Sequence, residues 1–233
     1  MGTRHLIFIQ LNGEYKLSQY GQWDGYLEGQ GLDVLNFLRT IMVPDALAST
    51  WVCTFCGHTN GIQYTACPHC GGTAPVNIMN TKLERFKYQV NKLRFATNEE
   101  VEDAWLTVGA TKGQPTVTME LSERMSQIYP SLHRDTGAKM LSYLYSYGGE
   151  RLLTINGETF STQGDCEYGY VIDLDNNKFE VYQGWNKTPL DEDERFYDGS
   201  DTDDAYGYYP LRLLSIWDMS ALPDDRTFLM NGK

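Results

Sequence analysis

A short run of apolar residues, Leu6 to Ile9, lies near the start of the chain, as in a buried strand. Residues 4–10 predict this strand, Asn12-Gly13 a tight turn, and residues 14–19 the returning strand of a hairpin. A glycine-punctuated loop, residues 21–31, comes next. The start of the chain therefore predicts an antiparallel strand pair that leads into a loop.

Apolar residues recur at helical spacing through the middle of the chain. Leu32, Leu35, Leu38 and Met42 mark the first such helix, and Pro44 ends it. A second predicted helix spans residues 83–93, and a short third one begins at Asn98 as its N-cap. A fourth spans residues 117–129 and stops at Pro130. The last runs from its cap, Asp135, to Tyr147, and Gly148-Gly149 terminates it.

The last third of the chain returns to strands. Alternation over residues 168–174, a turn at 175–177 and a second alternating run from Phe179 predict a hairpin. Residues 211–217 predict a further strand and residues 224–229 a last helical turn. Strands at both ends with helices between them predict an α+β fold with a mostly antiparallel sheet.

Acidic residues dominate residues 191–204, which contain a single Arg and predict a solvated surface loop without calcium-loop spacing. The 233-residue chain has a net charge of −12. A field of this sign repels phosphate backbones and anionic headgroups, so we expect no nucleic acid and no membrane among its partners. The sequence lacks a signal-peptide h-region and an apolar run of membrane-spanning length, which predicts a cytoplasmic protein.

Four of the five cysteines form two Cys-x-x-Cys pairs, Cys53 with Cys56 and Cys67 with Cys70. Each pair makes a knuckle whose sulfurs point the same way, and two knuckles supply the four thiolates of a tetrahedral Zn²⁺ site. Four protein ligands leave no open position, which predicts one structural zinc ion per chain. His58 and His69 lie close by and are weaker candidates as replacement ligands.

The segment that holds these cysteines interrupts the helical pattern. Residues 50–75 show no periodicity and are rich in Gly, Thr and His. They predict a zinc-ribbon module inserted into a main α+β domain made of residues 1–49 and 76–233.

This module resembles the nucleoporin-type zinc finger. Trp51, two positions before the first Cys, and Asn60, four after the second, match that family, in which the Asn braces the knuckle and the Trp packs on it. Its members bind ubiquitin or single-stranded RNA. Here Gly57-His58 replaces the Thr-Phe of the ubiquitin type, and no Lys or Arg between Trp51 and Pro75 is present to contact phosphates. A zinc ribbon that serves as a protein-contact knob fits the segment better.

Four segments outside the ribbon resemble a family of uncharacterised phage and prophage proteins. Members of this family typically lack the zinc module, in keeping with an insertion. The resemblance implies a phage-linked protein of the host cell cytoplasm, compatible with an anti-defence role, and brings no established activity. The segments are Gly2-Thr3-Arg4, Gln19-Tyr20-Gly21-Gln22-Trp23-Asp24-Gly25-Tyr26 with Gly29-Gln30-Gly31, Ser131–Ala138 and Cys166–Asp175.

The loop of residues 21–31 gathers hydrogen-bonding groups and one indole ring on a glycine-flexed backbone. Such a loop can close over a small polar ligand, with Trp23 stacking on it and Asp24 accepting hydrogen bonds. The alternative is a loop packed by Trp23 and Tyr26, in which Asp24 satisfies turn amides. The candidate ligand-binding residues are Arg4, Gln22, Trp23, Asp24 and Gln30.

Our leading functional hypothesis is an accessory protein that binds a small polar ligand or a host protein, because no complete catalytic set is visible. The alternative is a hydrolase of the N-terminal-nucleophile class, which would need processing to expose Thr3. Cys166 with His133 as base is a weaker candidate, since a plain buried thiol is far more common. Asp135 and its neighbours are interpreted as a helix cap.

Overall fold

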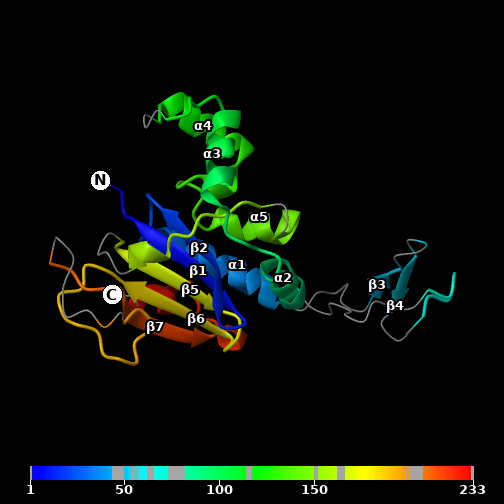
Figure 1. Cartoon of the computed structure of the whole chain (residues 1–233). Coiled ribbons are helices and arrows are strands. Elements are labelled where there is room, and N and C mark those ends of the chain that lie inside the picture. The colour runs from blue at the N-terminus through cyan, green and yellow to red at the C-terminus, as the bar shows by residue number, and fades with distance from the viewer. Residues whose placement is uncertain are drawn as a thin grey trace.

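The chain folds around a five-stranded sheet with the strand order β2-β1-β5-β6-β7 (Figure 1). Strands β1 and β5 run parallel, and every other neighbouring pair in the sheet is antiparallel. The predicted α+β class with a mostly antiparallel sheet is therefore confirmed. The strands are β1 His5–Leu11, β2 Glu14–Gly21, β5 Tyr168–Asp173, β6 Lys178–Gln183 and β7 Arg212–Asp218. This computed structural model describes residues 2–43, 50–53, 56, 58–61, 66–72, 82–113, 117–149, 152–161, 166–197, 199 and 207–231.

The N-terminal hairpin forms as its turn residues predict. Asn12 and Gly13 both adopt positive φ, 59° and 74°, as a tight two-residue hairpin turn requires. Across the parallel pair β1–β5, His5 lies opposite Tyr168 and Ile9 opposite Ile172. Strands from the two ends of the chain therefore lie side by side in the middle of the sheet.

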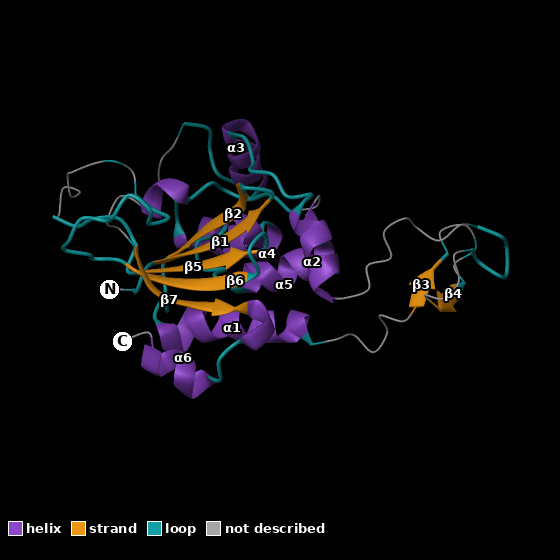
Figure 2. Ribbon diagram, turned by 90° about the horizontal axis from the view of Figure 1, so that it is seen from below, coloured by secondary structure: helices purple, strands orange, loops and turns teal. Residues whose placement is uncertain are grey.

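Four helices cover one face of the sheet (Figure 2). Their apolar sides bury Leu38, Phe86 and Phe228 in one core with Ile9 and Phe179 of the sheet. Burial of such side chains contributes about 1.5–3 kcal/mol each, so this core is the main source of stability. The helices are α1 Leu32–Met42, α2 Lys82–Val90, α5 Lys139–Tyr147 and α6 Asp225–Asn231.

The opposite face of the sheet is covered by the segment that follows β6. Leu190 and Phe196 pack there in a second cluster with Leu6 and Phe8 of β1. The prediction of a solvated surface loop at residues 191–204 agrees with the exposure of Asp191, Glu192 and Asp193 but is wrong for Phe196. Phe196 is buried because the sheet offers it an apolar surface that composition alone does not reveal. Residues 198 and 200–204 of this loop lie outside the described residues.

A third, smaller cluster is formed by α3 Asn98–Thr107, α4 Met119–Ile128 and the 3₁₀ turn Pro130–Leu132. This unit projects beyond the sheet on the side of β2 (Figure 1). Ala104 and Met125 are buried between the two helices. The unit forms one wall of the cleft described below.

Two of the predicted helix caps are wrong. Thr97, not Asn98, caps α3, and its backbone is extended. The Thr97 hydroxyl accepts a hydrogen bond from the Glu100 N–H at 3.2 Å, and the Glu100 carboxylate accepts one from the Thr97 N–H at 2.9 Å. Helix α5 begins at Lys139, beyond the reach of Asp135, and follows Ala138 without a side-chain cap. Both sites offer several capping residue types, and only the backbone conformation selects among them.

The cysteine-rich segment contains a short antiparallel pair, β3 Thr50–Val52 and β4 Thr59–Gly61. Figures 1 and 2 both show this strand pair apart from the five-stranded sheet. The predicted boundaries of the inserted module, between residues 49 and 50 and between residues 75 and 76, fall at or within segments outside the described residues, so the domain division stays a prediction. In the part of the chain that the structure describes, no helix combines the length and apolar character needed to cross a membrane.

Candidate functional site

The four cysteines of the ribbon come together in space. Their sulfur atoms all lie within 4.8 Å of one another. The Sγ atoms of Cys53 and Cys70 are 3.5 Å apart, and those of Cys56 and Cys67 are 3.7 Å apart. A tetrahedral ion with Zn–S bonds of about 2.3 Å would separate its sulfurs by about 3.8 Å. The donor set and its spacing therefore fit one zinc ion.

Backbone hydrogen bonds hold each knuckle in shape. The carbonyl of His58 accepts from the Cys53 N–H and from the Asn60 side chain, both at 2.9 Å. This is the bracing role that the zinc-finger resemblance implies for Asn60. The Cys67 carbonyl accepts from the Gly71 N–H at 2.8 Å in the second knuckle.

The electrostatic setting of Cys67 favours its metal-binding form. Burial by itself raises the pKa of this thiol, but the N–H groups of His69 and Cys70 point at the sulfur and outweigh that effect, with help from the Cys56 and Cys70 thiols. The pKa of Cys67 falls to about 6, whereas the pKa values of Cys56 and Cys70 are raised, so Cys67 is the thiol of this hydrogen-bonded cluster that most readily gives the thiolate form that binds metal. His58 and His69 are exposed and stack on each other, with ring centroids 5.4 Å apart. Among the described residues, the clustered ligand atoms belong to the four cysteines alone.

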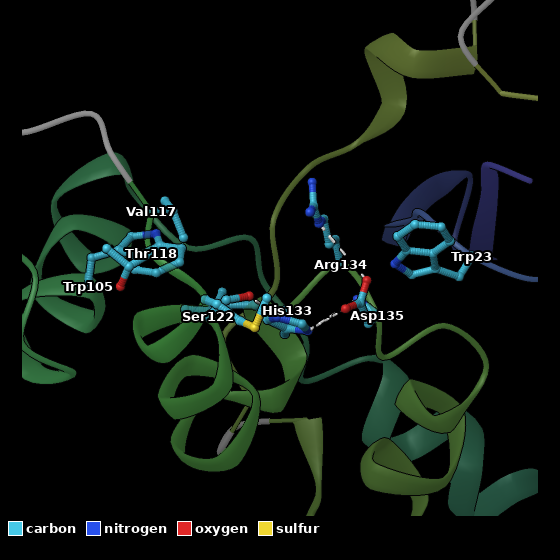
Figure 3. Close-up of a pocket in the computed structure, with 10 residues that line it drawn as sticks. Trp23, Trp105, Val117, Thr118, Ser122, His133, Arg134 and Asp135 are labelled. Carbon is cyan, nitrogen blue, oxygen red and sulfur yellow. Dashed lines mark hydrogen bonds and ion pairs between the residues drawn. The ribbon is translucent and has the colours of Figure 1, made fainter. Parts of the chain in front are cut away.

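A separate cleft of about 600 Å³ opens between the loop that follows β2 and the α3–α4 unit. Trp23 lines it from the loop, Trp105 from α3 and Ser122 from α4. Figure 3 shows the two indole rings at opposite ends of this space, with His133, Arg134 and Asp135 between them. The cleft thus combines two aromatic walls with a polar floor.

Hydrogen bonds from the N-terminal loop position that floor. The Gln22 N–H donates to the Arg134 carbonyl at 3.2 Å. The Ala138 N–H donates to Oε1 of Gln30 at 2.7 Å. Gly137 lies so close to Gln30 that an added Cβ would be 2.2 Å from its Oε1. Residues 21–31 and 131–138, both singled out in the sequence, therefore lie side by side.

Of the five predicted ligand-binding residues, Trp23 alone lines this cleft. Gln22 accepts a hydrogen bond from Tyr20 at 2.9 Å, and Gln30 holds the start of α5 as described above. Asp24 adopts a φ of 56° and its carbonyl accepts from the Gln30 N–H at 2.9 Å. The backbone N–H of Arg4 donates to Glu167 at 3.4 Å. These bonds give Gln22, Asp24 and Gln30 roles in shaping the loop.

His133 is the centre of a polar cluster on the cleft floor. Its Nε2 lies 2.8 Å from Ser122 Oγ, and its Nδ1 lies 3.8 Å from Asp135 Oδ2. The three residue types are those of a serine-hydrolase triad. However, the Asp135 backbone N–H donates to Nδ1 at 3.2 Å, so Nδ1 is an acceptor and the ring proton of neutral His133 lies on Nε2. In that tautomer the ring donates to Ser122 and cannot take its proton.

Cys166 does not line the cleft. It is buried in the cluster that contains Leu6 and Phe8, on the face of the sheet opposite the helices. The alternative pairing of Cys166 with His133 therefore has no support in the geometry, because His133 is bonded to Ser122 and Asp135.

Sequence reasoning missed Trp105, Ser122 and Arg134 as cleft residues. They come from three separate segments, and nothing in local periodicity connects them. No protein-family model, curated protein or solved structure matches this chain. The cysteine cluster and this cleft are therefore the two features of the described residues that bear on function.

Proposed function

We propose that this chain binds a small, planar, negatively charged molecule in the cleft between Trp23 and Trp105. The observation that carries the proposal is an exposed indole placed opposite a second one, with the Arg134 guanidinium between them. Aromatic walls with a few convergent polar groups are the usual make-up of a small-molecule site.

Trp23 is held ready for stacking. Its side chain is 47% exposed, although burial of the apolar indole ring would be favourable. The other side of the ring rests against Gly2, where an added Cβ would lie 2.1 Å from the indole Cε3. A ring backed on one side and open on the other offers contact area to a planar ligand at low entropic cost.

Two features select a negative charge in this acidic protein. Arg134 projects into the cleft with 60% of its side chain exposed, and its ion-pair partner Asp135 lies 4.0 Å away. Thr118 and Met119, at the start of the ten-residue helix α4, line the same cleft. The positive end of the helix dipole adds to the Arg134 charge there.

The hydrolase alternative has less support. An acyl-transfer site at Ser122 needs His133 to accept a proton through Nε2, and the bond from the Asp135 N–H directs that nitrogen to donate instead. Thr3, the candidate N-terminal nucleophile, uses its carbonyl to accept from the Gly25 N–H at 2.9 Å and does not line the cleft.

The zinc ribbon has a different proposed role. Four cysteines that fill a tetrahedral ion leave no ligand position for substrate, so the bound ion would stabilise the ribbon as a contact surface for a host protein. The resemblance to phage proteins supports an accessory role in the host cytoplasm, including an anti-defence role.

Titration with two aromatic acids, benzoate and 1-naphthoate, tests ligand binding. We expect either acid to quench tryptophan fluorescence, and Trp23→Ala and Arg134→Gln each to weaken binding at least tenfold. Trp185→Ala and Arg226→Gln are matched controls, since these residues are exposed and lie outside the cleft. Failure of both acids to bind, or binding that survives the first two substitutions, would contradict the proposal.

A further inference from the structure

Helix α3 has two apolar sides. On one side, Ala104 and Val108 are buried in the small cluster that α3 shares with Met125 of α4. A different side borders an open groove of about 350 Å³. The residues of that side recur at intervals of three and four, so they lie on one stripe of the helix. They are Asn98, Val101, Glu102, Trp105 and Leu106.

The rest of the groove is also largely apolar. Ala110 and Val117, between the two helices, and Leu121 of α4 line it opposite α3. Val117 is 56% exposed and Leu106 is 37% exposed, although burial of both side chains would be favourable. Of the described residues that line the groove, Trp105 and Val117 alone also line the cleft. The groove is therefore a second surface, on a unit that projects from the sheet (Figure 1).

The charge of the α3–α4 unit indicates which partner fits this groove. Residues 98–128 contain six carboxylates and two basic residues, a net charge of −4, against −12 for all 233 residues. Negative charge is thus more than twice as dense here as in the whole chain. Glu99 and Asp103 are exposed on α3, and Glu102 lines the groove in a solvent-exposed ion pair with Lys112. A basic partner is attracted by this field, and an acidic one is repelled.

The walls of the groove indicate the secondary structure of the partner. Helices satisfy their own backbone hydrogen bonds, and the described part of the unit contains no strand whose edge could pair with an extended peptide. A helical partner needs no backbone bonds and can lay one apolar stripe along the groove. Because α3 has ten residues and is about 15 Å long, it fits about three turns of such a helix.

A second copy of this chain does not offer a suitable helix. Among the described helices, α2 and α5 are those with more basic than acidic residues. Phe86 and Val90 of α2 are buried in the main core, as are Leu141 and Leu144 of α5. Their apolar stripes are therefore already covered by the sheet, and the groove fits a helix of another protein.

We propose that the groove binds a basic, amphipathic helix of a partner protein. The apolar stripe of that helix packs on Val101 and Leu106, and its lysine or arginine side chains lie near Glu99 and Asp103. This interaction is independent of ligand binding in the cleft and adds a contact surface to the one proposed for the zinc ribbon.

Three fluorescent peptides test the fit by anisotropy with the full chain. In the first, leucine and lysine follow helical spacing; in the second, the same residues alternate; in the third, glutamate replaces lysine at helical spacing. We expect the first to bind in the micromolar range and to weaken as salt is raised from about 0.05 to about 0.5 M, because salt screens exposed charges. The other two should bind roughly tenfold more weakly. Absence of binding by the first peptide, or equal binding by the second, would overturn the proposal.

Leu106→Asp and Ile128→Asp are matched variants. Both residues are exposed on helices of the unit, but of the two only Leu106 lines the groove. We expect Leu106→Asp to weaken binding of the helical leucine–lysine peptide roughly tenfold and Ile128→Asp to leave it unchanged. The two variants add the same negative charge, so a difference between them reports the groove. Equal affinities would place the peptide elsewhere.

A second pair of variants tests the charge with substitutions that leave the core untouched. Glu99→Gln with Asp103→Asn removes two charges beside the groove, and Glu192→Gln with Asp193→Asn removes two from exposed positions in the acidic loop. The first double variant should weaken binding several-fold more than the second. Equal weakening would mean that the charge of the whole chain attracts the peptide, and the groove would not be its site.

Discussion

The backbone N–H of Asp135 donates to Nδ1 of His133 at 3.2 Å, although these two residues are the acid and base of an apparent triad. The bond occupies the nitrogen that an orienting carboxylate would need, and it directs the ring proton of neutral His133 to Nε2. Ser122 Oγ, 2.8 Å from Nε2, is therefore a hydrogen-bond acceptor in this cluster. The cluster fixes the floor of the cleft.

This geometry predicts that Ser122 is not a nucleophile. A fluorophosphonate probe should leave the protein unlabelled under conditions that label a standard serine hydrolase to completion, because no base is placed to remove the hydroxyl proton. Intact-mass spectrometry reads the result directly. Labelling of wild type that disappears in Ser122→Ala would show that the cluster rearranges into a working triad.

The exposure of Trp23 predicts a small effect of its removal on stability. Because Trp23 is half exposed, we expect Trp23→Ala to cost about 1 kcal/mol or less, a melting shift of about 2–4 °C for a chain of this size. The core residue Phe86 is fully buried, and Phe86→Ala should cost about 3–5 kcal/mol. Thermal melts of the two variants make the comparison. A shift for Trp23→Ala as large as that for Phe86→Ala would make Trp23 a packing residue.

Substitution of Arg195, the single basic residue of the acidic loop 191–204, should lower the free energy of unfolding by a large amount. It pairs with Glu180 through Nε at 2.7 Å and Nη2 at 2.8 Å, and with Asp173 at 2.8 Å. The two carboxylate side chains are 7% and 1% exposed, so Arg195→Met leaves them uncompensated and should cost about 3 kcal/mol. Arg124→Met is the control, because its pair with Glu120 is exposed and contributes about 0–1 kcal/mol. Denaturant unfolding that gives equal losses would contradict this account.

The same network predicts a pH dependence. Burial alone raises the pKa of the Asp173 carboxyl, but hydrogen bonds from Asn176 and Arg195 outweigh it and hold the pKa below its usual value. A lowered pKa stabilises the fold above the unfolded value of about 3.9, and this contribution disappears as the pH falls through the folded value. The stability difference between wild type and Arg195→Met should therefore be largest near neutral pH and shrink in acid. Unfolding curves measured from pH 7 to pH 3 check this.

The cysteine cluster predicts one zinc ion per chain. Cys67→Ser should lose the metal, and Cys166→Ser, a substitution outside the cluster, should retain it. Metal analysis of the purified variants gives the stoichiometry. If the ribbon is a separate module, a chelator should change the ribbon signals alone and leave the main thermal transition in place. A single global melt on chelation would contradict that separation.

The net charge of −12 predicts that nucleic acid is not a partner. The segment between Trp51 and Pro75 contains no Lys or Arg, so the ribbon cannot neutralise phosphates as RNA-binding zinc fingers do. Single-stranded RNA should show no change in mobility or anisotropy with micromolar protein at physiological salt. A shift that weakens as salt is raised would reverse this prediction.

Features that depend on a few neighbouring residues were predictable. The Asn12-Gly13 turn follows from backbone conformations that these two residues adopt readily, and α1 stops before Pro44 because proline cannot continue a helix. The two Cys-x-x-Cys pairs likewise carry their geometry within a few residues. The capping residue of α3 could not be predicted in this way, since Thr97 and Asn98 are both good N-cap residues and only the backbone conformation distinguishes them.

The sequence by itself thus determined the fold class, the hairpins and the four-cysteine cluster, whose information lies in short stretches of chain. Tertiary structure alone decided that Arg195 is buried against Asp173 and Glu180, and that Trp23 faces a cleft shared with Trp105 and Arg134. These arrangements depend on which faces of distant segments pack together, as when the Gln22 N–H bonds the Arg134 carbonyl. Such pairings are selected by the total burial and hydrogen bonding of the whole chain, and local periodicity carries no record of them.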